Sequence, residues 1–110
     1  MNGYLLLMIA ILAEVVATSA LKASNGFSRP LASIVVVLGY ALAFYCLAFV
    51  LRTIPVGVAY ALWSGIGIAL ITSIGWVIFR QPLDAAALAG ISLIVAGVLV
   101  IQLFSRTTGH

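Results

Sequence analysis

Four long apolar stretches alternate with short polar breaks along the chain. The stretches cover about residues 4–21, 31–51, 58–79 and 85–104. A membrane-spanning helix needs about 20 mostly apolar residues, and each stretch has that length. The breaks contain Pro, Gly and charged residues, as turns between helices do. Because the stretches lack the alternating pattern of barrel strands, the sequence predicts an all-α membrane protein, with four transmembrane helices in a single domain over residues 1–110.

The composition supports a membrane location. Hydrophobic residues make up 65 % of the 110 residues and charged residues only 6 %. A soluble domain has about a quarter charged residues, and a chain this short has too little interior to hide so much apolar surface. The basic residues never cluster, so no nucleic-acid partner is expected. Glu14 interrupts the first apolar stretch, which is therefore interpreted as a retained helix rather than a signal peptide.

The basic residues are almost evenly divided between the two sides of the membrane. Four spans place both termini on one side. The first and third loops contain Lys22, Arg29 and Arg80, whereas the opposite side has Arg52 and Arg106. The positive-inside rule orients a membrane protein by such an asymmetry, and three against two is a weak bias. We infer that the chain can insert in both orientations, which would permit an antiparallel dimer.

Glu14 is the acidic residue that falls in the middle of a predicted span. It follows Tyr4 by ten residues, or about 15 Å of helix, close to the centre of a ~30 Å hydrocarbon core. A charge at that depth costs about 2.5–3.5 kcal/mol on the insertion scale, and no basic residue lies within a span to pair with it. One interpretation is a neutral carboxyl bonded to another helix. We favour a protonatable carboxyl in a water-accessible cavity, because intramembrane carboxyls are usually functional.

The helix face around Glu14 is predicted to line a pocket. Residues three and four apart share a helix face, and Ala10, Ala17 and Thr18 leave space beside the carboxyl. The alternative is tight helix packing, which also favours small residues. The predicted pocket residues from this helix are Tyr4, Leu7, Ala10, Ile11, Ala17 and Thr18.

Aromatic residues inside the second and third stretches are further candidates for the site. Tyr40 and Phe44 are four apart, and Tyr60 and Trp63 are three apart, so each pair shares a helix face. Aromatic rings attract cations, especially where water is excluded. Around a carboxylate, these rings suit a flat or quaternary organic cation, with ordinary apolar packing as the alternative.

Glycines in the third and fourth stretches suggest a bend and a helix contact. Gly65 and Gly67 lie mid-way along the third stretch, where glycine permits bending, either static or as a hinge. Gly90 and Gly97 lie two turns apart on one face of the fourth stretch, where small residues allow close helix approach. We interpret that face as a dimer contact, with packing inside one protomer as the alternative.

The sequence contains little that suggests other chemistry. Cys46 is the single cysteine, so neither an intrachain disulfide nor a Cys-based zinc site can form. No nucleophile–base set, metal cluster or phosphate loop is recognisable, so neither an enzyme nor a cofactor is expected. Asp84, four residues after Arg80 in a loop, is interpreted as an ion pair or a helix cap.

The motifs together resemble the small multidrug resistance family of bacterial transporters. The resemblance rests on the run from Ala13 to Val16, on Lys22 with Gly26-Phe27, and on the run from Ile54 to Gly67, and it covers the whole chain. The chain is most similar to the EmrE-type branch, whose members export quaternary cations. The resemblance implies a multi-pass protein of the bacterial inner membrane that works as an antiparallel homodimer.

The resemblance also implies roles for particular residues. Glu14 would be the site shared by protons and substrate, and the four aromatics would line the pocket. The glycine pair of the third helix would form a kink, and that of the fourth helix the main dimer contact. The branch usually has Gly where this chain has Ala17, and Trp where it has Tyr45. These departures would narrow the pocket and alter substrate preference. Ala17 also replaces the Trp typical of the guanidinium-exporting branch, which argues against that branch.

The leading hypothesis is export of lipophilic cations in exchange for protons. In a dimer, two Glu14 carboxyls would face one cavity. Loss of hydration and a nearby like charge both favour the protonated form of a carboxyl, so protons and drug cation would compete for the pair. Two alternatives stay open: a subunit of a heterodimeric transporter of the same family, and a structural membrane protein without transport activity.

Overall fold

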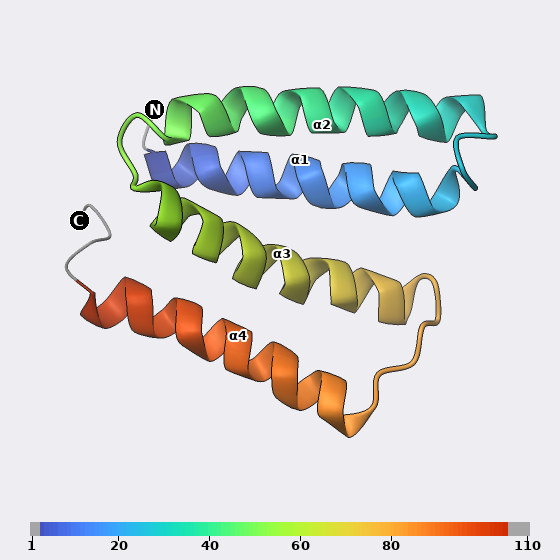
Figure 1. Ribbon diagram of the computed structural model, residues 1–110. Coiled ribbons are helices and arrows are strands. Elements are labelled where there is room, and N and C mark those ends of the chain that lie inside the picture. Colours follow the sequence, from blue (N-terminus) through green and yellow to red (C-terminus); the bar gives the residue numbers. More distant parts are fainter. Residues whose placement is uncertain (1–2, 106–110) are drawn as a thin grey trace. The chain divides into compact units, whose positions relative to one another are not determined.

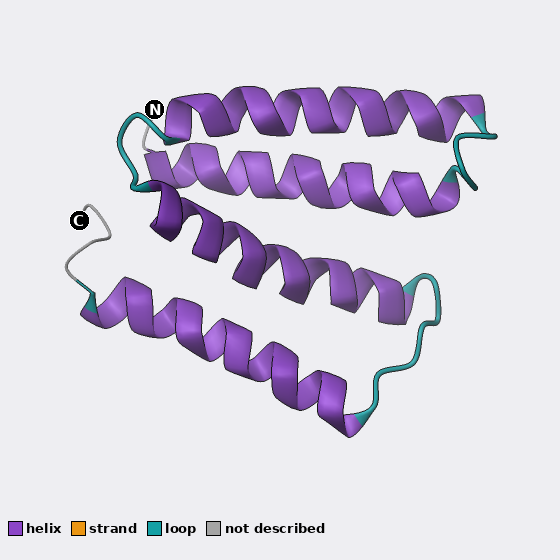
Figure 2. Ribbon diagram, viewed as in Figure 1, coloured by secondary structure: helices purple, strands orange, loops and turns teal. Residues whose placement is uncertain are grey.

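The protein consists of four helices over the residues that the structure describes, 3–105 (Figures 1 and 2). This computed structural model has α1 over Gly3–Ala23, α2 over Pro30–Val50, α3 over Val56–Val77 and α4 over Ala85–Phe104. All four are long and apolar enough to cross a membrane. The prediction of an all-α fold with four spans is therefore confirmed, while the antiparallel homodimer stays a prediction. Arg106 lies outside the described residues.

The chain divides into two compact units, Met1–Val50 and Leu51–His110. The first contains α1 and α2, which run in opposite directions side by side (Figure 1). The second contains α3 and α4, which form another helical hairpin. The expectation of a single four-helix domain stays a prediction.

The first hairpin is held at close range by small residues. A methyl group added at Gly39 of α2 would lie 2.8 Å from Ala17 Cβ and 3.1 Å from the backbone oxygen of Ala13, both in α1. Ala17 itself has no exposed surface. Small residues let transmembrane helices approach until their backbones nearly touch. The crossing therefore has room for one methyl group, and Ala17 supplies it.

Ser24 organises the loop that joins α1 to α2. Its buried hydroxyl donates to the carbonyl oxygen of Leu21 at 2.8 Å and accepts from the backbone N–H of Phe27 at 3.0 Å. Its carbonyl oxygen accepts from the backbone N–H groups of Ser28 and Arg29. These bonds support a left-handed stretch in which Phe27 has a φ of 67°, a conformation that bulky residues rarely adopt. One serine thus accepts hydrogen bonds from three backbone N–H groups of the tight turn.

The second hairpin has ends set by local chemistry. Pro55 precedes α3, and its carbonyl oxygen accepts from the N–H of Ala59 at 2.9 Å, so α3 begins two residues before the predicted position 58. Proline is tolerated there because the first N–H groups of a helix have no partner within the helix. α3 ends at Val77 rather than 79, just before Arg80 adopts a left-handed φ of 56°. Asp84 caps α4 by accepting from the N–H of Ala87 at 2.8 Å.

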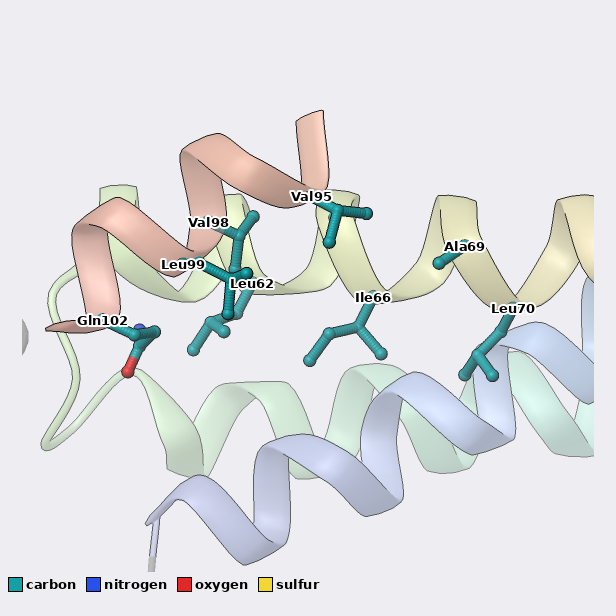
Figure 3. A pocket seen from close by; sticks show the side chains of 9 residues that line it. Leu62, Ile66, Ala69, Leu70, Val95, Val98, Leu99 and Gln102 are labelled. Carbon is teal, nitrogen blue, oxygen red and sulfur yellow. The ribbon is translucent and has the colours of Figure 1, made fainter. Parts of the chain in front are cut away.

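An open cavity of about 270 Å³ lies between α3 and α4 (Figure 3). Apart from the amide of Gln102, its walls are apolar. The lining residues are Leu62, Gly65, Ile66, Ala69 and Leu70 of α3, with Val95, Val98, Leu99 and Gln102 of α4. No residue of α4 is fully buried.

Replacing Gly39 by alanine should separate α1 from α2 and destabilise the protein by about 1–3 kcal/mol, the usual cost of overpacking. Denaturation of the purified protein in mixed micelles measures the change. Gly57→Ala is the matched control, because a methyl group at Gly57 meets nothing within 4 Å. Adding Ala17→Gly to Gly39→Ala should restore part of the stability, since it removes the nearest clashing atom. Equal stability of the two alanine variants would contradict the close crossing.

Candidate functional site

Glu14 lies about half-way along α1. It follows Gly3, the first residue of the helix, by eleven positions in a helix of 21 residues. At about 1.5 Å per residue this places it ~16 Å from the end of a ~30 Å helix, at the depth expected from the sequence. The side chain is partly buried. A carboxyl at this depth needs polar partners, because lipid tails offer none.

Thr18 and Tyr40 supply those partners. The hydroxyl of Thr18, one turn further along α1, donates to Glu14 Oε1 at 2.7 Å. The same Thr18 oxygen lies 2.6 Å from the hydroxyl of Tyr40 in α2. The three side chains thus form a chain of hydrogen bonds that starts at the carboxyl and crosses from α1 to α2. Sequence reasoning placed all three residues in the site, but had no means of detecting the chain that links them.

The second-helix aromatics form a continuous surface beside this chain. The rings of Tyr40 and Phe44 are stacked, with centroids 6.2 Å apart and planes inclined by 19°. Tyr40 is partly buried, whereas Phe44 exposes 58 % of its surface. The hydroxyl of Tyr40 thus contacts Thr18 of α1, and the neighbouring ring of Phe44 has an exposed aromatic face.

The other predicted pocket residues of α1 are packed inside the chain. Leu7, Ala10, Ile11 and Ala17 have between 0 and 2 % of their surface exposed. Ala17 faces Gly39 at the helix crossing, and Tyr4 is partly buried near the start of α1. The contact of these residues with a substrate stays a prediction.

Tyr60 and Trp63 belong to α3, in the second unit. Tyr60 exposes 73 % of its surface, and Trp63 is partly buried. An exposed tyrosine in an apolar span can contact lipid, another helix or a ligand. Membership of these two residues in the Glu14 site stays a prediction.

The four predicted glycines fall into two different environments. A methyl group at Gly65 would collide with Val98 of α4, and would lie 3.2 Å from its Cβ. Gly65 therefore has a packing function, whether or not it also serves as a hinge with Gly67, which is buried in α3. Gly90 and Gly97 are exposed, and a methyl group added at either meets nothing within 4 Å. The face that they share on α4 is thus free to receive another helix.

Sequence reasoning missed Gly39, the residue that brings the two helices of the site together. Its signal was present in the sequence: a glycine in the middle of an apolar span, directly before Tyr40. Small residues at such positions indicate a close helix contact. Gly39 meets Ala17 and Tyr40 meets Thr18, so consecutive residues of α2 contact consecutive residues of α1.

The sequence matches known proteins over its full length. The family model described as Small Multidrug Resistance protein matches residues 2–94. The multidrug transporter PA4990 of Pseudomonas aeruginosa is 61 % identical over 110 residues, all of both chains. The quaternary ammonium compound-resistance protein QacE of Escherichia coli is 54 % identical, and the multidrug transporter EmrE of Escherichia coli is 49 % identical, again over the whole of both chains.

These matches identify the class of protein that the fold and the intramembrane carboxyl define. The chain belongs to the small multidrug resistance family. It is a multi-pass protein of the bacterial inner membrane, and a member of a family of transporters rather than an enzyme. The resemblance seen in the sequence motifs is confirmed.

Gly65→Ala should destabilise the protein by about 1–3 kcal/mol, because the added methyl group displaces Val98. Combining it with Val98→Ala should recover most of that loss, since the colliding methyl groups are then absent. Denaturation in micelles gives the stabilities, and cation uptake into liposomes gives the activity. Recovery of both would assign Gly65 to packing, whereas recovery of stability without uptake would assign it to a hinge. If Val98→Ala gave no recovery of stability, the packing function of Gly65 would be wrong.

Proposed function

We propose that the protein exports lipophilic and quaternary ammonium cations in exchange for protons, with Glu14 as the group that both bind. The observation that carries this proposal is a carboxyl half-way along a helix long and apolar enough to span a membrane, held by Thr18 and linked to Tyr40. The second acidic side chain of the sequence, Asp84, caps α4 outside the spans. Relatives named for multidrug transport and for quaternary ammonium resistance support the choice of substrate.

The chemistry of the site suits a large, weakly hydrated cation. A quaternary ammonium group has no N–H to donate, so it is recognised by charge and by aromatic faces rather than by hydrogen bonds. Glu14 supplies the charge, and the stacked rings of Tyr40 and Phe44 supply an aromatic surface on the neighbouring helix. Thr18 occupies Oε1 of the carboxylate, which leaves Oε2 for the cation or a proton.

Coupling follows from competition for this carboxylate. A cation binds the charged form, and a proton abolishes that charge, so binding of either lowers the affinity for the other by the same factor. A pair of Glu14 carboxylates in one cavity would exchange bound protons for a cation in this way.

The pair requires a dimer, and α4 offers the surface for one. The Gly90 and Gly97 face is exposed and unobstructed, and transmembrane helices associate through such small-residue faces. The near balance of basic residues between the two sides supports an antiparallel arrangement. In that arrangement the two protomers exchange conformations when the cavity changes the side on which it opens. Lipid, protons, organic cations and a second copy of this chain are thus the proposed partners.

Glu14→Gln should abolish pH-gradient-driven uptake of ethidium into liposomes, and also the release of protons when ethidium binds, because the amide cannot titrate. Dye fluorescence and a pH indicator measure the two effects. Asp84→Asn is the matched carboxyl-to-amide control; it should transport normally, since asparagine also caps helices well. Retained proton release in Glu14→Gln would sink the coupling claim. Failure of the wild-type chain to transport when reconstituted alone would favour the heterodimeric or the structural alternative.

Gly97→Leu should weaken dimerisation in liposomes about tenfold or more, because the leucine holds the two α4 helices apart. Ala96→Leu adds the same side chain about 100° around the helix and should have a much smaller effect. Cross-linking over a range of protein-to-lipid ratios gives the dimer fraction. Equal dimer fractions for the two variants would show that the glycine face is not the contact.

A further inference from the structure

We propose that Asn25 and Gly26, in the loop between α1 and α2, form a site of spontaneous modification at which the asparagine amide is converted to a carboxylate. Both asparagines of the sequence, Asn2 and Asn25, are followed by glycine. Asn2 lies outside the described residues, so the inference concerns Asn25. It depends on the local chemistry of the loop and is independent of the transport activity proposed above.

The turn requires these two residues for their backbone conformation. Asn25 has a φ of 49° and Gly26 a φ of 69°, both in the left-handed region. Glycine and asparagine adopt this region more readily than other residues. The same pair also supplies the two groups that can close a five-membered ring. These are a side-chain amide carbon and, directly after it in the chain, a backbone nitrogen that no side chain shields.

Both groups are accessible. Asn25 and Gly26 are exposed. Within residues 3–105, neither the side-chain amide of Asn25 nor the N–H of Gly26 makes a hydrogen bond. A methyl group added at Gly26 would meet nothing within 4 Å. The backbone N–H of Asn25 lies 3.5 Å from the carbonyl oxygen of Lys22, which is a long and weak hydrogen bond.

The bonds that shape the turn bypass this pair. The hydroxyl of Ser24 accepts from the N–H of Phe27 at 3.0 Å. The carbonyl oxygen of Ser24 accepts from the N–H groups of Ser28 at 2.9 Å and Arg29 at 3.2 Å. Residues 25 and 26 thus connect two anchored ends without being anchored themselves, so the turn can persist while Asn25 rotates about its own bonds.

The reaction balances with water as the one co-reactant. The Gly26 nitrogen loses its proton to solvent base and forms a bond to Cγ of Asn25. The bond from Cγ to Nδ2 breaks, and ammonia leaves after taking up a proton, which gives a five-membered succinimide. Water then opens the ring at either of its two carbonyl carbons. One opening gives aspartate, and the other gives isoaspartate, in which the main chain runs through the side-chain carbons.

The product changes the loop in two ways. The new carboxylate lies between Lys22 and Arg29 in the sequence and lowers the positive charge of the loop. It also follows the end of α1 at Ala23, where a negative charge is unfavourable. Isoaspartate adds a carbon to the main chain between Ser24 and Phe27, which displaces the N–H of Phe27 from the Ser24 hydroxyl. We therefore expect the isoaspartyl form to have a less stable first hairpin.

Ageing of the purified protein in micelles, in water enriched in heavy oxygen, tests the site. Asn2→Ser in every sample leaves a single Asn-Gly pair. Mass spectrometry of fragments should place the heavy oxygen at residue 25. The rate should rise by up to about tenfold per pH unit, as the fraction of deprotonated nitrogen does. Asn25→Gln keeps an amide but would need a larger ring, so it should remain unmodified at that position.

Two further comparisons make the result decisive. Gly26→Ala should slow the conversion about tenfold or more, because its methyl group shields the nitrogen. Because alanine is also strained at the φ of Gly26, the folded chain is compared with the same chain unfolded in denaturant. The folded chain should convert within about tenfold of the unfolded rate, as expected of an open loop. A slower folded rate, or heavy oxygen absent from residue 25, would overturn the proposal.

The stability of the aged protein tests the expected effect on the hairpin. Aged wild-type protein should unfold in mixed micelles at a lower denaturant concentration than Asn25→Gln aged in the same way. Equal midpoints would show that the modification leaves the first hairpin intact, which would contradict the expected loss of the bond between Ser24 and Phe27.

Discussion

A carboxyl at the middle of an apolar span must be given polar partners by the protein, because lipid provides none. Most of the first hairpin can be understood from this constraint. Thr18 is placed one turn from Glu14 on the same helix, and Tyr40 reaches the same point from α2. The contact between Thr18 and Tyr40 would not exist if the helices were a little further apart. The glycine–alanine crossing at Gly39 and Ala17 thus brings the side chains of the candidate site together, although neither residue has a polar side chain.

The same packing device is used in both units, with different results. In the first hairpin a glycine faces an alanine, and the helices meet near the middle of the span. In the second hairpin Gly65 faces the larger Val98, and a cavity lined by apolar side chains and Gln102 lies alongside (Figure 3). α3 and α4 approach each other closely over fewer residues than α1 and α2 do. The second hairpin is therefore the less tightly packed of the two.

The sequence predicts well what depends on local composition. The four spans follow from runs of about 20 apolar residues, and the placement of Thr18 beside Glu14 follows from helical periodicity. It predicts poorly what depends on the rotation of one helix against another. Tyr40 faces Thr18, and Gly65 faces Val98. These contacts depend on how small residues pack where two helices cross, and the sequence of one span does not contain that information. The contribution of Tyr60 and Trp63 to the site depends on the placement of α3 and stays a prediction.

α4 is a fully formed helix whose surface is not covered by the rest of its own unit. It is capped by Asp84 and is apolar apart from Ser92 and Gln102, yet none of its residues is buried. In a bilayer such a surface is covered either by lipid tails or by protein. With the proposed dimer, the choice is governed by mass action, so the assembled fraction depends on the number of copies per area of membrane. Dilution in lipid would then lower the transport activity of each chain, because fewer chains would be in dimers. Expression level would therefore help to determine activity per molecule.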